Sequence, residues 1–316
     1  MGKILVGTCN WSDFEHFYPR GLKPNERLGY YARYFPLVEV DSTFYRLMPA
    51  RNFELWVERT PDDFSFDVKA YRTLTRHGPE HRPGARHEDD APELDPADDD
   101  FRAFKASIEP LRQAGKLRSI LFQFPPWFRE NEANREYLDT VRERFPDDLV
   151  SVEFRHRSWL DPQARADTFK RLRDLGLAYV AVDQPQLGSG SIPPVAEATS
   201  PALATVRFHG RNYQTWYRKD ARGSSERFNY LYSQNELADW VPKIEQLAEQ
   251  VKEVHVLMNN NRGNYAVVNA QDAMRLLGQP HLPLDIQPYP PPEPSAAREP
   301  RAGVAEPAPA QEKLPL

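Results

Sequence analysis

The sequence has a single cysteine, no long apolar run and no large excess of basic residues. The one cysteine, Cys9, cannot form a disulfide within the chain, which is typical of proteins from a reducing cytoplasm. No apolar stretch approaches the ~20 residues that a membrane-spanning helix needs, and Met1 to Lys3 lead directly into an expected strand. We therefore expect a cytoplasmic protein with no signal peptide and no membrane contact.

The formal net charge of −5 at pH 7 is unevenly distributed along the chain. Residues 88–100 carry eight acidic side chains and no basic one, so the remainder of the chain is mildly basic. That excess is too small for a general nucleic-acid footprint, but it permits a local anion site. The charge pattern therefore favours a small anionic partner over nucleic acid.

Eight short apolar runs alternate with segments of helical periodicity. Runs rich in Val, Ile, Leu and Phe are typical of a parallel sheet buried on both faces, and eight of them predict an α/β fold, a closed (β/α)8 TIM barrel. Each run closes on a polar or charged residue, and the active sites of such barrels lie at the C-terminal ends of the strands. The expected strands are Lys3–Thr8, Val38–Asp41, Phe64–Ala70, Ser119–Phe124, Val150–Arg155, Ala178–Asp183, Ala204–His209 and Glu253–Asn259.

The segments between these runs predict one barrel domain over residues 1–287. Residues 71–100 form a long, mobile acidic insertion after the third strand, and Gln184–Pro201, rich in Pro, Gly and Ser, replaces a regular sixth helix. Residues 288–316, rich in Pro and Ala, form a disordered C-terminal tail, because they hold too few large apolar residues to build a core. The expected helices are Asn25–Phe35, Asn52–Arg59, Phe101–Gly115, Glu132–Arg144, Pro162–Gly176, Asn235–Val251 and Gln271–Leu277.

Side chains along a strand alternate between the two faces of the sheet. The outer face must pack under apolar helices, so in each strand the alternating set that holds the charges is expected to face the barrel axis. This inward set is Glu39, Asp41, Asp67, Lys69, Gln123, Glu153, Arg155, Asp183, Arg207, His209, His255 and Asn259. Buried charges are costly unless they are paired, so these groups should form an ion-pair network, either purely structural or completed by a bound ligand.

Several strings in the sequence resemble one known family. They are GTCNW, YYARYFPLVEVDSTFYRLMP, TPDDFSFDVKAYRTLTRH, LFQFPPWF, SVEFRHRSWL, VRFHGRNY and MNNNRGNYAVVNA, spread over roughly residues 3–277. Together they are similar to the YecE-like family, catalogued as domain of unknown function 72. The resemblance implies a TIM barrel with these motifs at the strand ends, and it supplies no reaction.

The candidate catalytic residues are Glu153, Asp183, His209 and Asp41. The first three close or nearly close successive strands, and neighbouring strands lie about 4.8 Å apart, so their side chains could converge on one ligand. They could act in acid/base catalysis, or Glu153, Asp183 and His209 could bind one divalent metal ion, although no cofactor is firmly implied. The His-x-His signature of many barrel metallohydrolases is absent from residues 7–11.

The candidate substrate-binding residues combine cations, amides and aromatic rings. Guanidinium and ammonium groups suit phosphate or carboxylate, and aromatic planes can stack on sugars or nucleobases, although any one of them can equally pack in the core. The set comprises Lys69, Arg155, Arg207, Gln123, Asn259, Tyr45, Arg46, Trp11, Trp159 and Tyr213.

These residues favour an enzyme, a hydrolase or lyase, that acts on a small anionic, ring-containing substrate such as a phosphosugar or nucleotide fragment. Two alternatives stay open: a protein that binds or processes single-stranded nucleic acid, and a metabolite-binding module without catalysis. A retaining glycosidase is disfavoured because the fourth strand offers Gln123 where a second carboxylate would be needed. The sequence predicts no oligomeric state.

Overall fold

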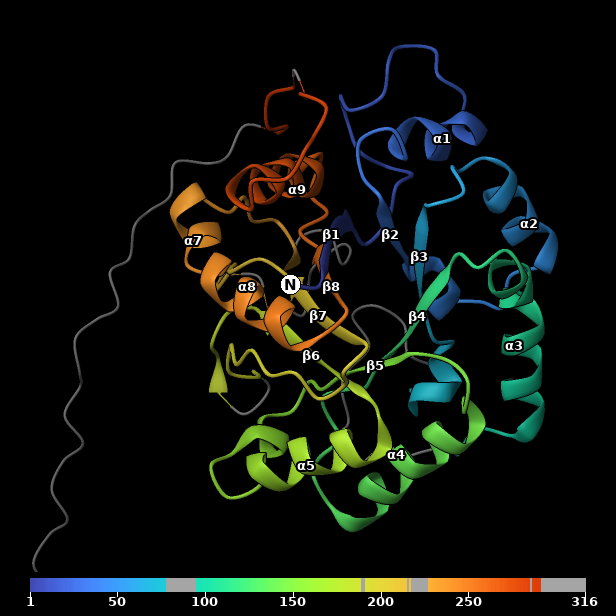
Figure 1. Cartoon of the computed structure of the whole chain (residues 1–316), viewed down its shortest axis with the longest axis vertical. Coiled ribbons are helices and arrows are strands. Elements are labelled where there is room, and N and C mark those ends of the chain that lie inside the picture. The colour runs from blue at the N-terminus through green and yellow to red at the C-terminus, as the bar shows by residue number, and fades with distance from the viewer. Residues whose placement is uncertain (78–94, 189–190, 215, 217–226, 285, 291–316) are drawn as a thin grey trace, which may run out of the picture.

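A computed structural model describes residues 1–77, 95–188, 191–214, 216, 227–284 and 286–290 (Figure 1). Eight parallel strands close into a barrel in chain order, so the predicted TIM barrel is confirmed. Each strand begins and ends within two residues of its predicted bounds. The strands are β1 Lys3–Thr8, β2 Leu37–Val40, β3 Ser65–Lys69, β4 Leu117–Gln123, β5 Val150–Glu153, β6 Ala178–Asp183, β7 Leu203–Phe208 and β8 Glu253–Met258.

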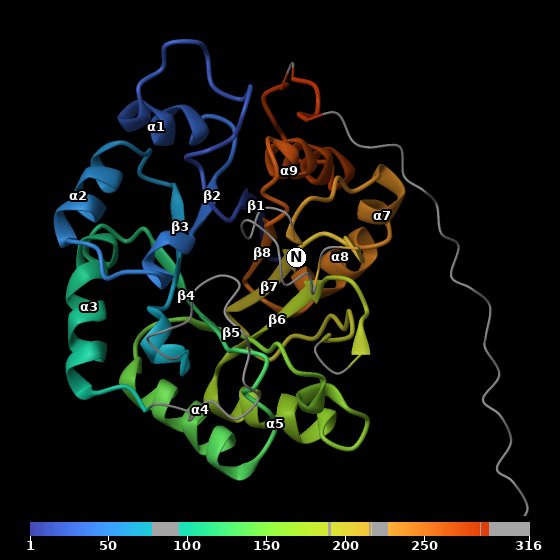
Figure 2. The ribbon, with the colours of Figure 1, turned by 180° about the vertical axis from the view of Figure 1, so that it is seen from behind.

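Helices surround this barrel, as both views of the ribbon show (Figures 1 and 2). The α-helices are α1 Arg27–Tyr31, α2 Ala50–Glu58, α3 Asp98–Gln113, α4 Glu132–Arg144, α5 Arg165–Leu175, α7 Gln234–Ala238, α8 Val241–Gln250 and α9 Tyr265–Leu276. Short 3-10 helices are η1 Pro24–Glu26, η2 Asp41–Phe44, η3 Arg72–Thr75 and η4 Arg157–Leu160. Within the described part of the chain, no helix is both long and apolar enough to cross a membrane.

Two helix predictions differ most from the structure in their bounds. The single helix expected over Asn235–Val251 is divided into α7 and α8, because Pro242 lacks an amide hydrogen and stands in the first turn of α8. Helix α9 begins at Tyr265, six residues before the expected start at Gln271. Its buried face includes Ala266 and Asn269, so packing against the barrel extends the helix toward β8.

The closure of the barrel between β1 and β2 depends on a glycine. These two strands pair through Gly7 with Leu37 and Thr8 with Val38. A Cβ atom on Gly7 would lie 2.1 Å from the Leu37 carbonyl oxygen, so a residue with a side chain could not approach this closely. Tyr31 of α1 also joins β1 to β2, because its hydroxyl donates to the Leu37 carbonyl and accepts from the Thr8 amide.

Most buried apolar side chains belong to one large cluster that packs the helices against the barrel. A separate, small cluster consists of Leu5, Cys9, Leu37 and Leu257. The register pairs Gly7 with both Leu37 and Leu257, and Leu5 with His255, so this small cluster lies on the inward face. Polar side chains therefore fill much of the remaining barrel interior.

The predicted irregular segments are described in part. The acidic run ends in helix, because Asp98, Asp99 and Asp100 form the first turn of α3, where the helix dipole favours negative charge. Residues 78–94 of the insertion and 291–316 of the tail lie outside the described residues. Residues 184–188 and 191–202 contain no α-helix, as expected for the sixth connection.

Part of the segment predicted as tail contacts the barrel. The Tyr289 amide donates to the side-chain oxygen of Asn264, the Asn264 amide donates to the Tyr289 carbonyl, and the Asn264 side chain also donates to the Gln287 carbonyl. Gly263, with a φ of 55°, makes room for this contact, since a Cβ atom there would lie 1.6 Å from the Tyr289 oxygen. These contacts join residues 287–290 to the barrel, and the Pro290 carbonyl also accepts from Tyr265.

Candidate functional site

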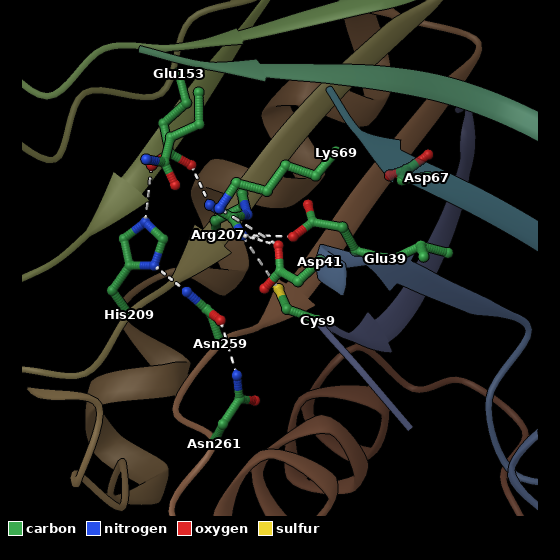
Figure 3. A network of polar contacts seen from close by, with 12 residues as sticks. Cys9, Glu39, Asp41, Asp67, Lys69, Glu153, Arg207, His209, Asn259 and Asn261 are labelled. Carbon is green, nitrogen blue, oxygen red and sulfur yellow. Dashed lines mark hydrogen bonds and ion pairs between the residues drawn. The ribbon is translucent and has the colours of Figure 1, made fainter. Parts of the chain in front are cut away.

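Arg207 of β7 lies fully buried inside the barrel and joins carboxyl groups from two distant strands (Figure 3). Its Nη1 atom contacts Glu153 of β5, and its Nη2 atom lies 2.5 Å from Glu39 Oε1 of β2. The same Nη2 atom is 3.8 Å from Asp41 Oδ1 and 3.5 Å from Cys9 Sγ. This clustering of charged side chains was predicted from the sequence, and Arg207 lies at the centre of the cluster.

Glu153 extends the network toward the mouth of the barrel. Its Oε1 atom is 2.5 Å from Arg155 Nε and 3.3 Å from His209 Nε2. Arg155 Nη2 in turn lies 3.3 Å from Gln123 Oε1 and 3.2 Å from His209 Nε2. We call the connected set the central cluster; its members are Cys9, Glu39, Asp41, Lys69, Gln123, Glu153, Arg155, Arg207, His209, Asn259 and Asn261.

A chain of amides reaches His209. Asn261 Nδ2 donates to Asn259 Oδ1 at 3.0 Å, and Asn259 Nδ2 lies 2.9 Å from His209 Nδ1 (Figure 3). On the other side of the ring, His209 Nε2 lies near both Arg155 Nη2 and Glu153 Oε1. Burial and the neighbouring Arg155 lower the pKa of His209 to about 3, so the ring is neutral at physiological pH.

Two carboxyl groups on Arg207 have opposite protonation states. Burial raises the pKa of Glu39 to about 8, and Asp41 adds to the shift while Arg207 opposes it. Burial also disfavours the charged form of Glu153, yet Arg155 and Arg207 hold the pKa of Glu153 well below its usual range. At pH 7 Glu39 therefore carries a proton and Glu153 carries a negative charge.

The protonation of Glu39 leaves the central cluster with one positive charge in excess. Its three cationic side chains face two ionised carboxylates: Lys69, Arg155 and Arg207 against Asp41 and Glu153. Buried charge is costly unless it is neutralised nearby. An anion bound at the mouth would neutralise this excess positive charge.

The charged side chains at the open edge of the cluster are Asp41, Lys69 and Arg155, and Gln123 and Asn261 are also partly exposed. Those three charged side chains are 22%, 10% and 10% exposed, whereas those of Glu153, Arg207 and His209 are fully buried. Lys69 Nζ lies 3.5 Å from Asp41 Oδ1 and 4.7 Å above the ring of Phe44. A ligand that enters the mouth would therefore meet one carboxylate and two cations first.

The structure does not assemble the predicted metal ligands. Glu153 and His209 are neighbours, but Asp183 makes its contacts elsewhere. Ligand atoms of Cys9, Glu39 and Asp41 do lie within 4.8 Å of one another. Arg207 already contacts each of these three groups and supplies the positive charge that a metal ion would bring, so this trio does not fit a resident cation.

The prediction that Asp183 faces the barrel axis is wrong. In the register, Val182 pairs with the inward Arg207 and Asp183 pairs with Phe208, whose ring packs on Trp240 outside the barrel. The Asp183 carboxylate accepts two hydrogen bonds from Arg211, at 2.8 and 2.7 Å, and one each from Tyr232 and Trp240, both at 2.7 Å. We call Asp183, Arg211, Tyr232 and Trp240 the outer cluster.

The predicted aromatic ligands are dispersed. Trp159 is buried between Phe128 and Phe154, and its indole nitrogen donates to the Phe128 carbonyl, so it packs the core and does not line the mouth. Trp11 packs edge-on against Trp56 at 5.0 Å. The remaining predictions near the strand ends are exposed side chains: Tyr45 at 53%, Tyr213 at 56%, and Arg46.

Other predicted inward residues belong to a second group deeper in the barrel. His255 Nδ1 lies 2.7 Å from Asp67 Oδ2, and its Nε2 lies 2.7 Å from Glu253 Oε1. Burial opposes the charged form, but Asp67 and Glu253 raise the pKa of His255 to about 9. Glu253 is the first residue of β8, so this group lies toward the end of the barrel opposite the mouth.

Four residues at the site were not among the predicted site residues, and one of them is Asn261, which donates to Asn259. Cys9 and Glu39 contact Arg207, and Gln184 is buried directly after β6. Glu39 belonged to the predicted inward set, so the alternation already indicated it. Gln184 would have been found by reading the alternation of β6 from Val180 and Val182, because the next residue in that series is Gln184.

Comparison with known proteins gives one consistent result. A family described as protein of unknown function DUF72 matches residues 5–295. The UPF0759 protein YunF of Bacillus subtilis (strain 168) is 38% identical over 276 residues, which cover 87% of this chain and 94% of YunF.

Solved structures agree with the sequence comparison. A DUF72 family protein of Enterococcus faecalis V583 superposes with a TM-score of 0.77 at 29% identity, covering 90% of this chain and 99% of its own. A DUF72 family protein of Thermotoga maritima MSB8 gives a TM-score of 0.72 at 33% identity, with coverage of 88% and 100%. The resemblance noted in the sequence is thus confirmed, and the chain belongs to the DUF72 family.

Proposed function

We propose that this protein is an enzyme, a hydrolase or lyase, that acts on a small anionic, ring-containing substrate at the mouth of the barrel. One observation carries the proposal: two carboxyl groups, Glu39 and Asp41, lie together beside Arg207, and burial raises the pKa of Glu39 to about 8. Pairs of titratable groups whose surroundings give them different protonation states at one pH are typical of acid–base catalysis.

Glu39 and Asp41 would act as the acid and the base on the same substrate. The carboxyl oxygens of Glu39 and Asp41 lie within 4.8 Å of each other, and Asp41 is the partly exposed member. Hydrolysis and elimination each remove a proton at one atom and deliver a proton to a leaving group. Asp41 would accept the first proton, and Glu39 would donate the second.

The remaining groups would bind and orient the substrate. Lys69 and Arg155 carry the positive charge at the mouth and would hold the anionic group. Glu153 and His209 would act as positioning residues, since Glu153 contacts both arginines and the imidazole lies 3.3 Å from Glu153 Oε1. Asp183 has no role in the proposed function, because its carboxylate accepts hydrogen bonds from the other members of the outer cluster, Arg211, Tyr232 and Trp240.

The test is a turnover screen of phosphosugars and nucleotides, followed by NMR of the mixture. We expect one compound to be consumed, with loss of at least about 100-fold in rate for Asp41→Asn, the scale of a lost acid or base. The rate should fall as pH rises through about 8, where Glu39 loses the proton it must donate. Full activity in Asp41→Asn would refute the assignment of the base.

The other functions considered would leave different signatures. A ligand that binds at the mouth and is recovered unchanged after prolonged incubation would indicate a metabolite-binding module. Tight binding of single-stranded oligonucleotides that weakens steeply with salt would indicate a nucleic-acid protein.

A further inference from the structure

Gln184 is a buried amide without a hydrogen-bond partner among the described residues. Its side chain is 3% exposed, and neither Oε1 nor Nε2 makes a hydrogen bond within that part of the chain. An unpaired buried amide is expensive, so natural structures rarely keep one without a role. Both its donor and its acceptor are available to a ligand.

The strand register places Gln184 at the mouth. Val182 pairs with Arg207 across β6 and β7, and the His209 amide donates to the Asp183 carbonyl, so the next inward position on β6 lies beside His209. That position is Gln184. It therefore lies between the strand ends that carry Arg155 on one side and His209 on the other.

Two aromatic rings lie beside His209. Phe228 lies 6.1 Å and Trp216 6.5 Å from the His209 ring, and the two rings meet edge to face at 6.2 Å. Trp216 is buried and Phe228 is partly exposed. A flat ring seated against Phe228 would bring its edge toward the strand ends of β6 and β7.

We propose that Gln184 is a substrate-binding residue whose amide pairs with a neighbouring donor and acceptor on a planar ring of the substrate. A nucleobase edge has this pattern, and a nucleoside monophosphate joins such an edge to an anion for Arg155 and Lys69. The inference rests on the proposed function for its anion site, and it narrows the substrate class from phosphosugars and nucleotides to nucleotides alone.

The first experiment measures thermal stability, because a residue kept for binding should add nothing to the fold. Gln184→Met retains length and removes both polar atoms, and we expect its Tm to equal or exceed that of the wild type. The matched control is Asn269→Leu in α9. Asn269 is also fully buried, but it pairs with Tyr232 and Asn260, so its loss should lower Tm. A fall in Tm for Gln184→Met as large as that of the control would overturn the proposal.

The second experiment measures binding by calorimetry, with ribose 5-phosphate and the four ribonucleoside 5′-monophosphates as probes. We expect at least one nucleotide to bind about tenfold or more tightly than ribose 5-phosphate, since an unpaired buried amide gains its partners. Gln184→Met should reduce that ratio to about threefold or less and leave ribose 5-phosphate binding unchanged.

The outcomes separate this inference from the proposed function. If ribose 5-phosphate and all nucleotides bind equally, and Gln184→Met changes neither, the role of Gln184 is refuted while the anion site stands. If none of the probes binds, the anion site fails and the inference falls with it.

Discussion

Two clusters of charged side chains lie on opposite faces of the same barrel wall, and they differ in how fully their polar atoms are paired. In the outer cluster, each carboxylate oxygen of Asp183 accepts two hydrogen bonds. In the central cluster, Glu39 Oε2 and Arg207 Nε are buried and make no hydrogen bond within the described residues. Both carboxylate oxygens of Asp183 are therefore fully hydrogen-bonded, whereas the central cluster has polar atoms that could still bind a ligand.

This difference bears on the roles of the two clusters. Asp183 connects the end of β6 to Arg211, to Tyr232 before α7 and to Trp240 before α8, so it stabilises the barrel wall. Burial raises the pKa of Glu39, whose Oε1 atom contacts Arg207 while Oε2 makes no hydrogen bond within the described residues. Under the proposed function, the fully paired cluster contributes to stability and the incompletely paired one binds the substrate.

The largest loss of stability is expected for Arg207→Met. The substitution removes the cation that Glu153 and Glu39 share, and breaking a buried pair typically costs about 3–5 kcal/mol of unfolding free energy. Urea denaturation would measure it. Arg211→Met is the matched control in the outer cluster; Arg211 is 29% exposed, so water can replace part of its contacts and a smaller loss is expected. Equal losses would show that the two clusters do not differ in burial energy.

The second-largest loss of stability is expected for Asp183→Asn, about 2 kcal/mol of unfolding free energy. The substitution replaces one of the two acceptor oxygens with an amide donor, which then faces other donors. Ligand binding at the mouth should be unchanged, since the side-chain hydrogen bonds of Asp183 in the described part of the chain go to the outer cluster and none goes to the central cluster. Urea denaturation and calorimetry would check the two expectations. A variant with normal stability and no ligand binding would return Asp183 to the site.

The sequence could predict the barrel and most of its polar interior, because both depend on local alternation. The strands carrying Glu39, Lys69, Glu153 and Arg207 each hold their charges in one alternating set, so the inward face was evident. Strand β6 reads AYVAVD, with one charge at its end and only apolar residues in the other set. There the charge indicated the wrong face.

Burial and pairing could not be predicted from the sequence, because they depend on residues far apart in the chain. Trp159 was expected at the mouth, but Phe128 and Phe154 enclose it. The proton on Glu39 depends on burial and on Asp41 and Arg207, which stand on different strand ends. Such effects arise only once the barrel has closed.

A smaller effect is expected for Tyr232→Phe, which removes one of the four donors to Asp183 and the acceptor of the Gly210 amide. Because Arg211 still donates to the same carboxylate oxygen, we expect the unfolding free energy to fall by about 1–2 kcal/mol, as measured by thermal denaturation. The matched control is Tyr179→Phe. The Tyr179 hydroxyl is buried and has no partner in the described residues, so its removal should leave Tm unchanged or higher. Similar losses in both variants would contradict the distinction between paired and unpaired groups.

The smallest effect is expected for Glu39→Gln at pH 5, where the wild-type carboxyl group is already neutral. The two side chains are then similar in shape and charge, and the unfolding free energies should agree within about 1 kcal/mol. As pH rises from about 4.5 to 8, the unfolded wild type loses a proton that the folded state keeps, so wild-type stability falls. The variant has no such proton, so its stability relative to the wild type should increase over this window.

Infrared spectroscopy would test the cause directly. A carbonyl band of a protonated carboxylic acid should be present in the folded wild type at pH 7 and absent from Glu39→Gln. Glu153→Gln should keep that band, because Arg155 and Arg207 already hold Glu153 in its ionised form. If the band is missing from the wild type, Glu39 is ionised, the central cluster is charge-balanced without a ligand, and the distinction from the outer cluster rests on unpaired atoms alone.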